Sequence, residues 1–333
     1  MRPDVEAMKR RMPLLQYLQN HGWAGRPTGS RHECVGLCPL HTETLPSFYV
    51  NTAKNLFYCH GCGQGGDLLR FVELYLGLSF RDSLAHLKQQ LDPALFSEDA
   101  LLRHTVAFYK SHLQSHDEAG AYLQQRGIRD SSLIDRLAIG YAPGATLRGF
   151  LTDLGFRLDL LLQTGLVDER NRDTFYRRIV IPCYEWGRIV NLYGRSITGV
   201  APHRFLPRSR GGLFAWHTVQ TSPNTIVVEG LFDVLTLWQA GFVQTTCCYG
   251  AYLTEPQFAQ LCDRPEREVF VAFDSDANGA GQTAALKLVQ RLHAAGLCAH
   301  AVTLPERHDP NSYFLAGATA ADFQACLDEA RHL

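Results

Sequence analysis

The stretch Val269-Phe-Val-Ala-Phe-Asp-Ser-Asp-Ala-Asn-Gly-Ala-Gly281 carries a short apolar run into two aspartates and a glycine-rich turn. A second apolar run, Thr225-Ile-Val-Val, leads in the same way into Glu229-Gly230. Both runs have the length and β-branched content of buried strands, and a helical pattern follows each of them. They predict strands of a parallel α/β sheet, whose carboxyl ends meet at one edge.

Glu229, Asp274 and Asp276 are therefore expected to gather at that edge. Carboxylates crowded together repel one another unless cations lie among them, and Mg²⁺ or Mn²⁺ prefers such oxygen ligands. Two ions of this kind can stabilise the attacking and leaving oxygens of a displacement at phosphorus. An Asp-x-Asp pair alone is more often a solvated turn, so the prediction depends on its pairing with the strand that ends at Glu229.

A second pattern pairs Cys38-Pro-Leu-His41 with Cys59-His-Gly-Cys62. Zinc takes four tetrahedral ligands from sulfur and nitrogen, and a two-residue gap lets both side chains of each pair reach one ion. Four protein ligands leave no open position, so we predict one structural Zn²⁺ bound by Cys38, His41, Cys59 and Cys62. Cys34 and His60 lie nearby but do not fit the paired spacing.

Composition narrows the class of protein. The chain has 333 residues, 46% of them hydrophobic, and ten cysteines. That length predicts two or three domains, and no apolar window reaches the roughly 18 residues of a membrane span. The N-terminus lacks a signal-peptide pattern. We therefore expect a cytoplasmic protein with no membrane partner, whose cysteines include metal ligands.

The formal net charge is −1, whereas proteins that bind nucleic acid usually carry a basic excess. The positive charge is concentrated locally, because residues 170–210 contain nine arginines against Asp173 and Glu185, an excess of seven. Arginine binds phosphate oxygens bidentately, so this stretch is the candidate surface for a template backbone and a triphosphate. Some of its arginines, such as Arg170, Arg172 and Arg188, are as well explained by solvation alone.

The residues 38–48 and 57–67 resemble the zinc-binding domain of bacterial DnaG-type primases. The Glu229 and Asp274 segments resemble the Toprim fold that these primases share with topoisomerases and some nucleases. Further stretches resemble the primase catalytic core in the same order along the chain. They are Ala107-Phe-Tyr, Tyr122-Leu-x-x-Arg-Gly127, Leu137–Pro143, Arg178–Pro182, Leu192-Tyr-Gly-Arg195, Gly250–Thr254 and His308-Asp-Pro-Asn311.

This resemblance implies an α/β fold, α+β overall, divided into five segments. They are a zinc-ribbon template-binding domain at 1–90, a linker at 91–100, the N-terminal subdomain of the primase core at 101–222, a Toprim catalytic subdomain at 223–305, and the third acidic motif with a short tail at 306–333. The linker also follows from the proline and turn-forming residues between two helical patterns. From Leu101 to Gln125 the apolar spacing predicts a helix.

The resemblance also implies roles for individual residues. Asp274 and Asp276 would hold the catalytic metal, and Asp309, in the third acidic motif, would assist them. Glu229 would either bind metal or help to remove the proton from the attacking hydroxyl. Arg178, Arg195 and Arg204 match basic residues of the family's active-site cleft. Within the zinc ribbon, Phe48 and Tyr58, together with Phe57, offer rings on which unpaired bases could stack, although each ring taken singly is better explained as part of the ribbon core.

The function implied is that of a DNA primase, which joins nucleoside triphosphates into short RNA primers on single-stranded DNA and leaves an RNA/DNA hybrid. Two alternatives stay open. A Toprim nuclease would use the same acids to cut rather than join. A catalytically silent protein would bind single-stranded nucleic acid without metal-dependent synthesis.

Three departures from the family pattern bear on activity. Ala215-Trp216 stands where a lysine is usual, Asn311 replaces a second aspartate, and Ala251 replaces a threonine. We expect a missing cationic contact at the first and a more loosely held metal at the second. The chain also ends about twenty residues after Asp309, so we expect a compact primase of the kind carried by mobile elements, with helicase coupling absent or supplied by another protein.

Overall fold

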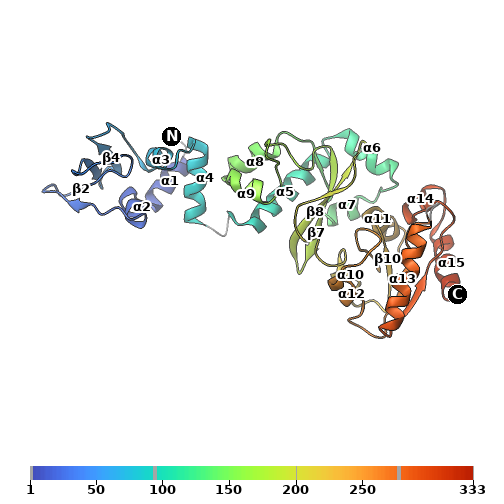
Figure 1. Cartoon of the computed structure of the whole chain (residues 1–333). Coiled ribbons are helices and arrows are strands. Elements are labelled where there is room, and N and C mark those ends of the chain that lie inside the picture. Colours follow the sequence, from blue (N-terminus) through green and yellow to red (C-terminus); the bar gives the residue numbers. More distant parts are fainter. Residues whose placement is uncertain (1–2, 93–95, 200, 276–278, 333) are drawn as a thin grey trace. The chain divides into compact units, whose positions relative to one another are not determined.

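The computed structural model describes residues 3–92, 96–199, 201–275 and 279–332 (Figure 1). It divides into two compact units, each built from two segments of the chain. The first comprises Met1–Thr105 and Ala145–Thr174, and the second comprises Val106–Gly144 and Phe175–Leu333. Among the described residues, no helix is both long and apolar enough to cross a bilayer.

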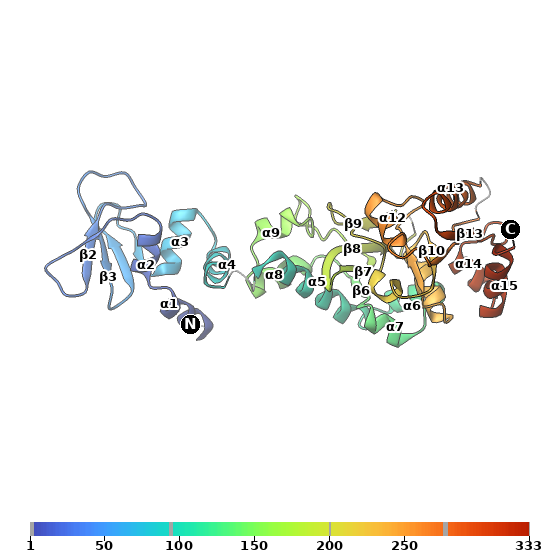
Figure 2. The same ribbon diagram turned by 90° about the horizontal axis from the view of Figure 1, so that it is seen from below.

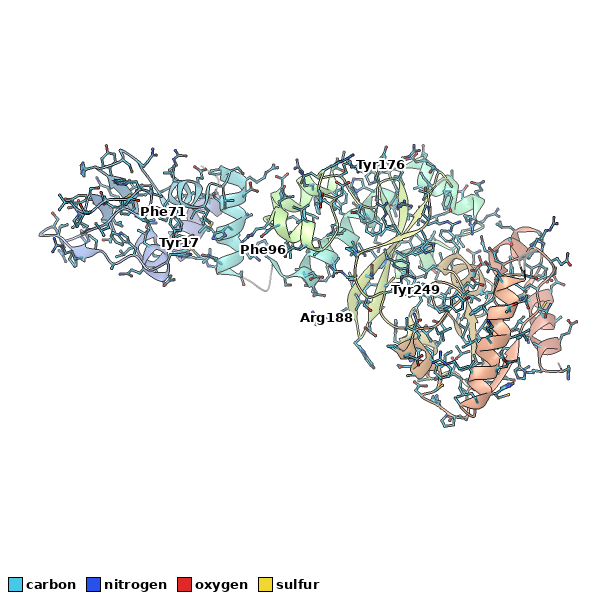
Figure 3. All side chains as sticks on the ribbon, in the orientation of Figure 1. Tyr17, Phe71, Phe96, Tyr176, Arg188 and Tyr249 are labelled. Atoms are coloured by element: carbon cyan, nitrogen blue, oxygen red, sulfur yellow. The ribbon has the colours of Figure 1, made fainter. Side chains whose placement is uncertain are left out.

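The N-terminal segment of the first unit contains a small antiparallel sheet in the order β1-β2-β3-β4-β5. Two helices precede this sheet along the chain, and two follow it. Its elements are α1 (Pro3–Arg11), α2 (Leu14–Asn20), β1 (Arg26–Pro27), β2 (Glu33–Gly36), β3 (Phe48–Asn51), β4 (Leu56–Cys59), β5 (Gly65–Gly66), α3 (Leu68–Leu76) and α4 (Phe80–Leu91). Tyr17 of α2 and Phe71 of α3 meet edge to face at 6.2 Å in the core of this unit (Figure 3). Phe71 also packs edge to face against Phe48 of β3 at 6.0 Å, so the buried rings stabilise the packing of the helices on the sheet.

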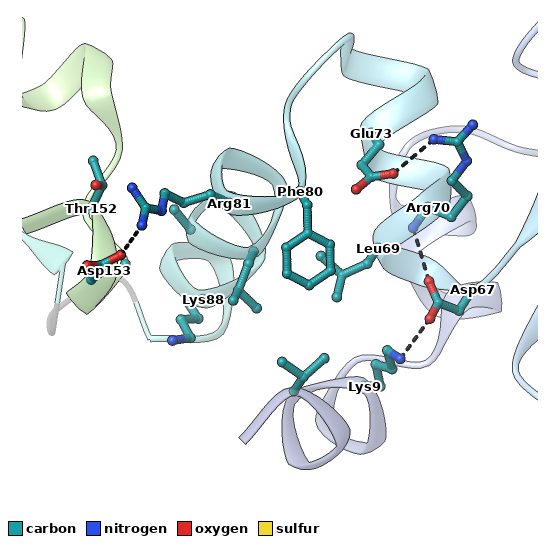
Figure 4. Close-up of a pocket in the computed structure, with 14 residues that line it drawn as sticks. Lys9, Asp67, Leu69, Arg70, Glu73, Phe80, Arg81, Lys88, Thr152 and Asp153 are labelled. Atoms are coloured by element: carbon teal, nitrogen blue, oxygen red, sulfur yellow. Dashed lines mark hydrogen bonds and ion pairs between the residues drawn. The ribbon is translucent and has the colours of Figure 1, made fainter. Parts of the chain in front are cut away.

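A later segment of the chain, α8 (Leu147–Leu154) and α9 (Leu158–Gln163), also belongs to this unit. Residues of α1, α3, α4 and α8 line a cavity of about 610 Å³ (Figure 4). Lys9 pairs with Asp67 at 2.7 Å, and Arg81 pairs with Asp153. These ion pairs link residues of different helices across the cavity. We therefore interpret the cavity as a gap where the helices pack together and not as a ligand site.

The second unit contains an antiparallel sheet in the order β6-β7-β8-β9 and the helices that flank it. The elements are α5 (Glu98–Leu113), which crosses the division between the units, α6 (Asp117–Gln125), α7 (Ser131–Arg136), β6 (Gly140–Ala142), β7 (Arg178–Glu185), β8 (Arg188–Ser196) and β9 (Arg204–Phe205). The single helix predicted from Leu101 to Gln125 is wrong. It breaks between α5 and α6, where Ser115 Oγ donates to the His112 carbonyl and His116 adopts an extended backbone.

The rest of this unit is a parallel sheet in the order β11-β10-β12-β13. Its elements are α10 (Trp216–Val219), β10 (Asn224–Val228), α11 (Leu231–Gln239), β11 (Thr245–Cys247), α12 (Glu255–Leu261), β12 (Glu268–Val271), α13 (Ala280–Ala294), β13 (Cys298–Ala301), α14 (Pro310–Leu315) and α15 (Ala320–Ala330). The strands predicted at 225–228 and 269–271 are confirmed as β10 and β12, which pair in parallel.

Alternate residues of β10 and β12 face opposite layers of helices. Ile226 and Phe270 pack in one cluster with residues of α11 and α15, whereas Val227 and Val269 pack in another with residues of α12 and α13. Figure 2 shows α13 on one side of β13 and α14 and α15 on the other. Burial on both faces explains why these strands are continuously apolar in the sequence. The polar residues are therefore displaced to the strand ends, where the site lies.

Candidate active site and zinc centre

Cys38, His41, Cys59 and Cys62 lie together in the small antiparallel sheet, with one ligand atom from each within 4.8 Å of the others. Cys38 follows β2 and Cys59 closes β4, so strand pairing brings the two short motifs side by side. The donor set of three sulfurs and one imidazole nitrogen matches a closed structural zinc site. The predicted site for one Zn²⁺ therefore fits the residues present, and neither Cys34 nor His60 belongs to the group.

Glu43 orients the histidine of this group. Its Oε2 lies 3.2 Å from His41 Nε2, and its Oε1 accepts from the Cys38 backbone amide at 2.7 Å. His41 Nδ1 is then the nitrogen that faces Cys59 Sγ, at 3.9 Å. A carboxylate behind a ligating histidine fixes both ring orientation and tautomer. The motif Cys-Pro-Leu-His-x-Glu contains Glu43, but its spacing alone did not reveal this role.

Two further features describe the surroundings of this centre. Burial raises the pKa of the Cys38 thiol to about 12, so a bound cation would be needed to keep Cys38 as a thiolate. Gly61 leaves the space that the ligands use, because a Cβ at this position would lie 2.7 Å from His41 Nε2. Residues other than the four ligands therefore also contribute to the shape of this site.

The two aromatic residues predicted to stack on bases differ in exposure. Phe48 is fully buried and stacks on Phe57 at 5.1 Å, so it presents no face to a base. The binding role predicted for Phe48 is wrong, and the core alternative holds. Tyr58 is 49% exposed on the alternate face of β4 and keeps a ring accessible.

In the parallel sheet, Glu229 follows β10 and Asp274 follows β12 at the same edge. The Asp274 backbone amide donates to Glu229 Oε1 at 3.2 Å. Gly281, in the first turn of α13, allows this approach, because a Cβ there would lie 2.2 Å from the Asp274 carbonyl oxygen. Asp276 lies outside the described residues.

Asp309 reaches the same site from the loop after β13. It is the N-cap of α14, with Pro310 in the first turn and its side chain accepting from the Ser312 amide. The Ser275 amide donates to the His308 carbonyl at 2.9 Å, which ties this loop to the one that carries Asp274.

Asp233, in the first turn of α11, is a fourth carboxylate of the cluster and is buried. Its Oδ2 accepts from the Gly230 amide at 3.2 Å and its Oδ1 from the Asn311 amide at 3.1 Å. Burial, and then the neighbouring carboxylates of Asp309 and Asp274, raise the pKa of Asp233 well above its usual value. Acidic groups that disfavour one another's ionisation are the donor set that a hard divalent cation would stabilise.

These acids surround a cavity of about 300 Å³. It is lined by Arg126, Tyr193, Arg195, His203, Glu229, Gly230, Leu231, Phe232, Asp233, Tyr249, Gly250, Asp274 and Asp309. A carboxylate cluster beside two arginines can hold metal and phosphate together. The cavity thus has the chemistry needed for reaction at a phosphate group.

The predicted basic residues contribute unequally. Arg195 lines the cavity and donates from Nε to the Tyr122 hydroxyl at 3.3 Å. Arg204 is exposed on β9, but Arg178 is only 6% exposed and donates to the Pro202 carbonyl at 3.0 Å. The geometry therefore leaves Arg178 little surface for a phosphate and assigns it a structural contact.

Arg126 was not selected from the sequence as a site residue, although the stretch that contains it was. Its guanidinium lies over the Phe232 ring at 5.1 Å, and its buried Nε has no hydrogen-bond partner among the described residues. Asp233 was missed in the same way, since it reads as an ordinary first-turn acid of the helix after Glu229. Their signals were present in the sequence, but only the packing brings both residues to the cavity.

The departures from the expected pattern have structural settings of their own. Trp216 is packed in the core with Arg267 over its ring at 4.7 Å, so neither side chain replaces the expected lysine at the cavity. Asn311 is 1% exposed, and its Nδ2 donates to the Arg126 carbonyl at 2.8 Å and to Thr236 Oγ1 at 2.7 Å. Asn311 is therefore built into the support beneath the acids and does not line their cavity.

Comparison with known families assigns most of the chain. Residues 4–100 match the CHC2 zinc finger, residues 108–217 match the N-terminal domain of the DNA primase catalytic core, and residues 226–314 match a Toprim-like domain. The three matches follow one another without overlap, as the order of the motifs predicts.

Curated relatives include DNA primases of Aquifex aeolicus, 30% identical over 94% of this chain, and of Deinococcus radiodurans, 31% identical over 89%. These alignments cover 66% and 56% of the relatives, and that of the Clostridium acetobutylicum DNA primase covers 51%. The chain therefore spans about half to two thirds of the length of these relatives.

Solved structures of primases have the same fold as this chain. The zinc-binding and RNA polymerase domains of the Aquifex aeolicus primase superpose with a TM-score of 0.62 and 28% identity, covering 99% of this chain and 86% of that one. A DnaG primase catalytic domain bound to single-stranded DNA shares the fold, at a TM-score of 0.58 and 23% identity, over 69% of this chain and 80% of that one. With its zinc ribbon, primase core and Toprim domain in this order, the chain belongs to the bacterial DnaG-type DNA primase family.

Proposed function

We propose that this chain synthesises short RNA primers on single-stranded DNA by metal-dependent nucleotidyl transfer. The observation that carries the proposal is the cavity in which Glu229, Asp274 and Asp309 lie beside Arg126 and Arg195. Joining nucleotides requires both the neutralisation of phosphate charge and the alignment of two substrates. A site that combines metal-binding acids with arginines meets both requirements.

Glu229, Asp274, Asp276 and Asp309 would hold Mg²⁺ or Mn²⁺, with Asp233 as an additional carboxylate. The fit rests on the donor set, because burial and then the carboxylates of Asp309 and Asp274 raise the pKa of Asp233, and a bound cation would favour its charged form. When bound, two such ions would stabilise the attacking 3′-oxygen and the leaving pyrophosphate. The protein's own part is to hold the oxygen ligands at a fixed strand edge.

Arg195 and Arg126 are proposed to bind the triphosphate of the incoming nucleotide. The guanidinium groups of both are positioned by aromatic neighbours, Arg195 by the Tyr122 hydroxyl and Arg126 by the Phe232 ring. A preorganised arginine loses less side-chain freedom when it binds a phosphate. Exposed Arg204 is a candidate contact for the template backbone, and the structure offers less support for Arg178.

The zinc ribbon, with the exposed ring of Tyr58, is proposed to contact unpaired template bases. Its Cys38, His41, Cys59 and Cys62 would keep the sheet folded around one Zn²⁺. The division into segments 1–90, 91–100, 101–222, 223–305 and 306–333 remains part of this proposal. The three family matches support its order.

A single experiment separates synthesis from cleavage. The purified chain is incubated with Mg²⁺, ribonucleoside triphosphates and single-stranded DNA labelled at its 5′ end, with the ribonucleotides carrying a second label. We expect short labelled RNA and intact DNA. Shortened DNA without RNA would favour the nuclease, and template binding with neither product would favour the silent binding protein.

A further inference from the structure

A second group of potential metal ligands lies on the parallel sheet, away from the acids at its carboxyl edge. Glu268 is the first residue of β12, and Cys298 is its register partner at the start of β13. His300, two residues further along β13, projects to the same side as Cys298. Strand pairing alone therefore brings these three side chains together at the amino edge of the sheet.

The ligand atoms already have the separations of a coordinated set. His300 Nε2 lies 3.2 Å from Glu268 Oε1 and 3.3 Å from Cys298 Sγ, and one ligand atom from each residue lies within 4.8 Å of the others. Bonds of about 2.0–2.3 Å at tetrahedral angles place neighbouring ligand atoms about 3.3–3.8 Å apart. Only small side-chain adjustments would be needed for the three atoms to bind one ion.

We propose that Glu268, Cys298 and His300 form a second metal site, for a divalent ion of borderline softness such as Zn²⁺. One sulfur, one imidazole nitrogen and one carboxylate oxygen form a mixed donor set that suits zinc better than Mg²⁺. Cys298 is exposed and the side chains of His300 and Glu268 are partly exposed, so solvent would reach an ion bound here. The site is therefore open to water or to an incoming ligand, unlike the closed zinc ribbon.

Neighbouring side chains hold these ligands in place. The His300 ring stacks on Phe270 at 5.3 Å, which fixes its plane. Arg331, after α15, donates from Nε to Glu268 Oε1 at 2.9 Å and from Nη2 to Oε2 at 2.7 Å. Carboxylates that bind metal are commonly hydrogen-bonded by such outer partners.

Arg331 is also the group that opposes a cation here. It keeps a second carboxylate partner in Asp328 Oδ1, at 3.1 Å, and its guanidinium lies over the Phe270 ring at 4.9 Å. Because Asp328 can retain Arg331 on the end of α15, Glu268 is able to turn one oxygen toward the ion. Removal of Arg331 should therefore change the affinity of the site without abolishing it.

Metal stoichiometry tests this proposal independently of primer synthesis. The zinc-replete chain is equilibrated by dialysis against low-micromolar Zn²⁺ with a non-thiol reductant, and zinc per chain is measured by mass spectrometry. The variants are Cys298→Ala and His300→Gln, and the matched control is Cys326→Ala, a half-buried cysteine of α15 that is not part of the group. A thermal melt of each variant checks that it is folded.

We expect two zinc ions in the wild type and in Cys326→Ala, but one in Cys298→Ala and in His300→Gln. Substitution with Co²⁺ gives a second readout, because the thiolate-to-cobalt absorption of the wild type should exceed that of Cys298→Ala by the share of one thiolate. One zinc in the wild type, or two in both variants, would overturn the proposal. Equal cobalt spectra for wild type and Cys298→Ala would do the same.

Discussion

The backbone amide of Asn311 donates to Oδ1 of Asp233 across 3.1 Å, which joins the start of α14 to the first turn of α11. The Asn311 side chain extends this link through its amide, which donates to the Arg126 carbonyl and to Thr236 Oγ1. One buried residue thus touches the segments that carry an acid and an arginine of the cavity. It supports the cavity through neutral hydrogen bonds and adds no further negative charge.

Asn311→Asp is expected to destabilise the protein in Mg²⁺-free buffer by about 1–3 kcal/mol, because a carboxylate cannot donate to the Arg126 carbonyl and adds charge beside Asp233. Mg²⁺ should recover part of the loss, so the rise in Tm on adding Mg²⁺ should be larger than in the wild type. Asn191→Asp, at a buried amide that donates to the Leu206, Arg208 and Ser209 carbonyls, is the control. Equal Mg²⁺ responses in the two variants would contradict the role given to Asn311.

The raised pKa of Asp233 predicts a pH-dependent stability. A carboxyl whose pKa is raised by folding contributes stability that is complete below its ordinary pKa of about 3.9 and is lost as the pH rises toward the folded value. In Mg²⁺-free buffer, the Tm of the wild type minus that of Asp233→Asn should therefore fall as the pH increases above that ordinary value. Thermal melts across a pH series measure it, and a difference that stays constant would show that Asp233 is ionised throughout.

Glu43→Gln should weaken zinc binding by about 10- to 100-fold, because the charged partner of His41 is lost while the four ligands remain. Competition with a chromogenic zinc chelator measures the affinity. Glu73→Gln is the control, since Glu73 pairs with Arg70 in the same unit and is not in the ligand group. Unchanged affinity in Glu43→Gln would show that His41 does not depend on its carboxylate.

Gly281→Ala should disrupt the active site although it adds only one methyl group. The new Cβ would lie 2.2 Å from the Asp274 carbonyl oxygen and 3.0 Å from Glu229 Oε1, so the loop that carries Asp274 must move. We expect a large loss of primer synthesis and weaker Mn²⁺ binding by titration calorimetry. Gly120→Ala, in the helix α6 with open space at its Cβ, should retain both properties and gain about 0.5–1 kcal/mol of stability. Full activity in Gly281→Ala would show that synthesis does not depend on the observed positions of Asp274 and Glu229.

The features that local pattern determines were predictable from the sequence. The paired motifs at Cys38 and Cys59 predicted the zinc group, because a two-residue gap lets both side chains of each pair face one ion. The strands at 225 and 269 were recognisable because burial on both faces leaves them apolar. The prediction that Glu229 and Asp274 lie close together came from the strands, since the carboxyl ends of parallel strands meet at the same edge of a sheet.

The remainder depends on contacts between distant segments. Asp233 is held at the cavity by a hydrogen bond from the Asn311 amide, and Arg126 by its packing on the Phe232 ring. Neither contact is marked by a characteristic spacing of residues in the sequence. Phe48 and Tyr58 are both aromatic strand residues, and only the fold decides which ring is buried. Within the first unit, the packing of Phe156, which follows α8, against Phe96 likewise has no local signal.

The most direct test of the account is template-dependent incorporation of labelled ribonucleotides by the wild type, Asp274→Asn and Asp117→Asn. Asp117 is exposed on the first turn of α6 and does not line the cavity, so it controls for the loss of one surface carboxylate. We expect short RNA from the wild type and from Asp117→Asn in Mg²⁺, and at least about a 100-fold loss in Asp274→Asn. Equal product from Asp274→Asn and the wild type, or no template-dependent RNA from the wild type, would contradict primer synthesis at this site.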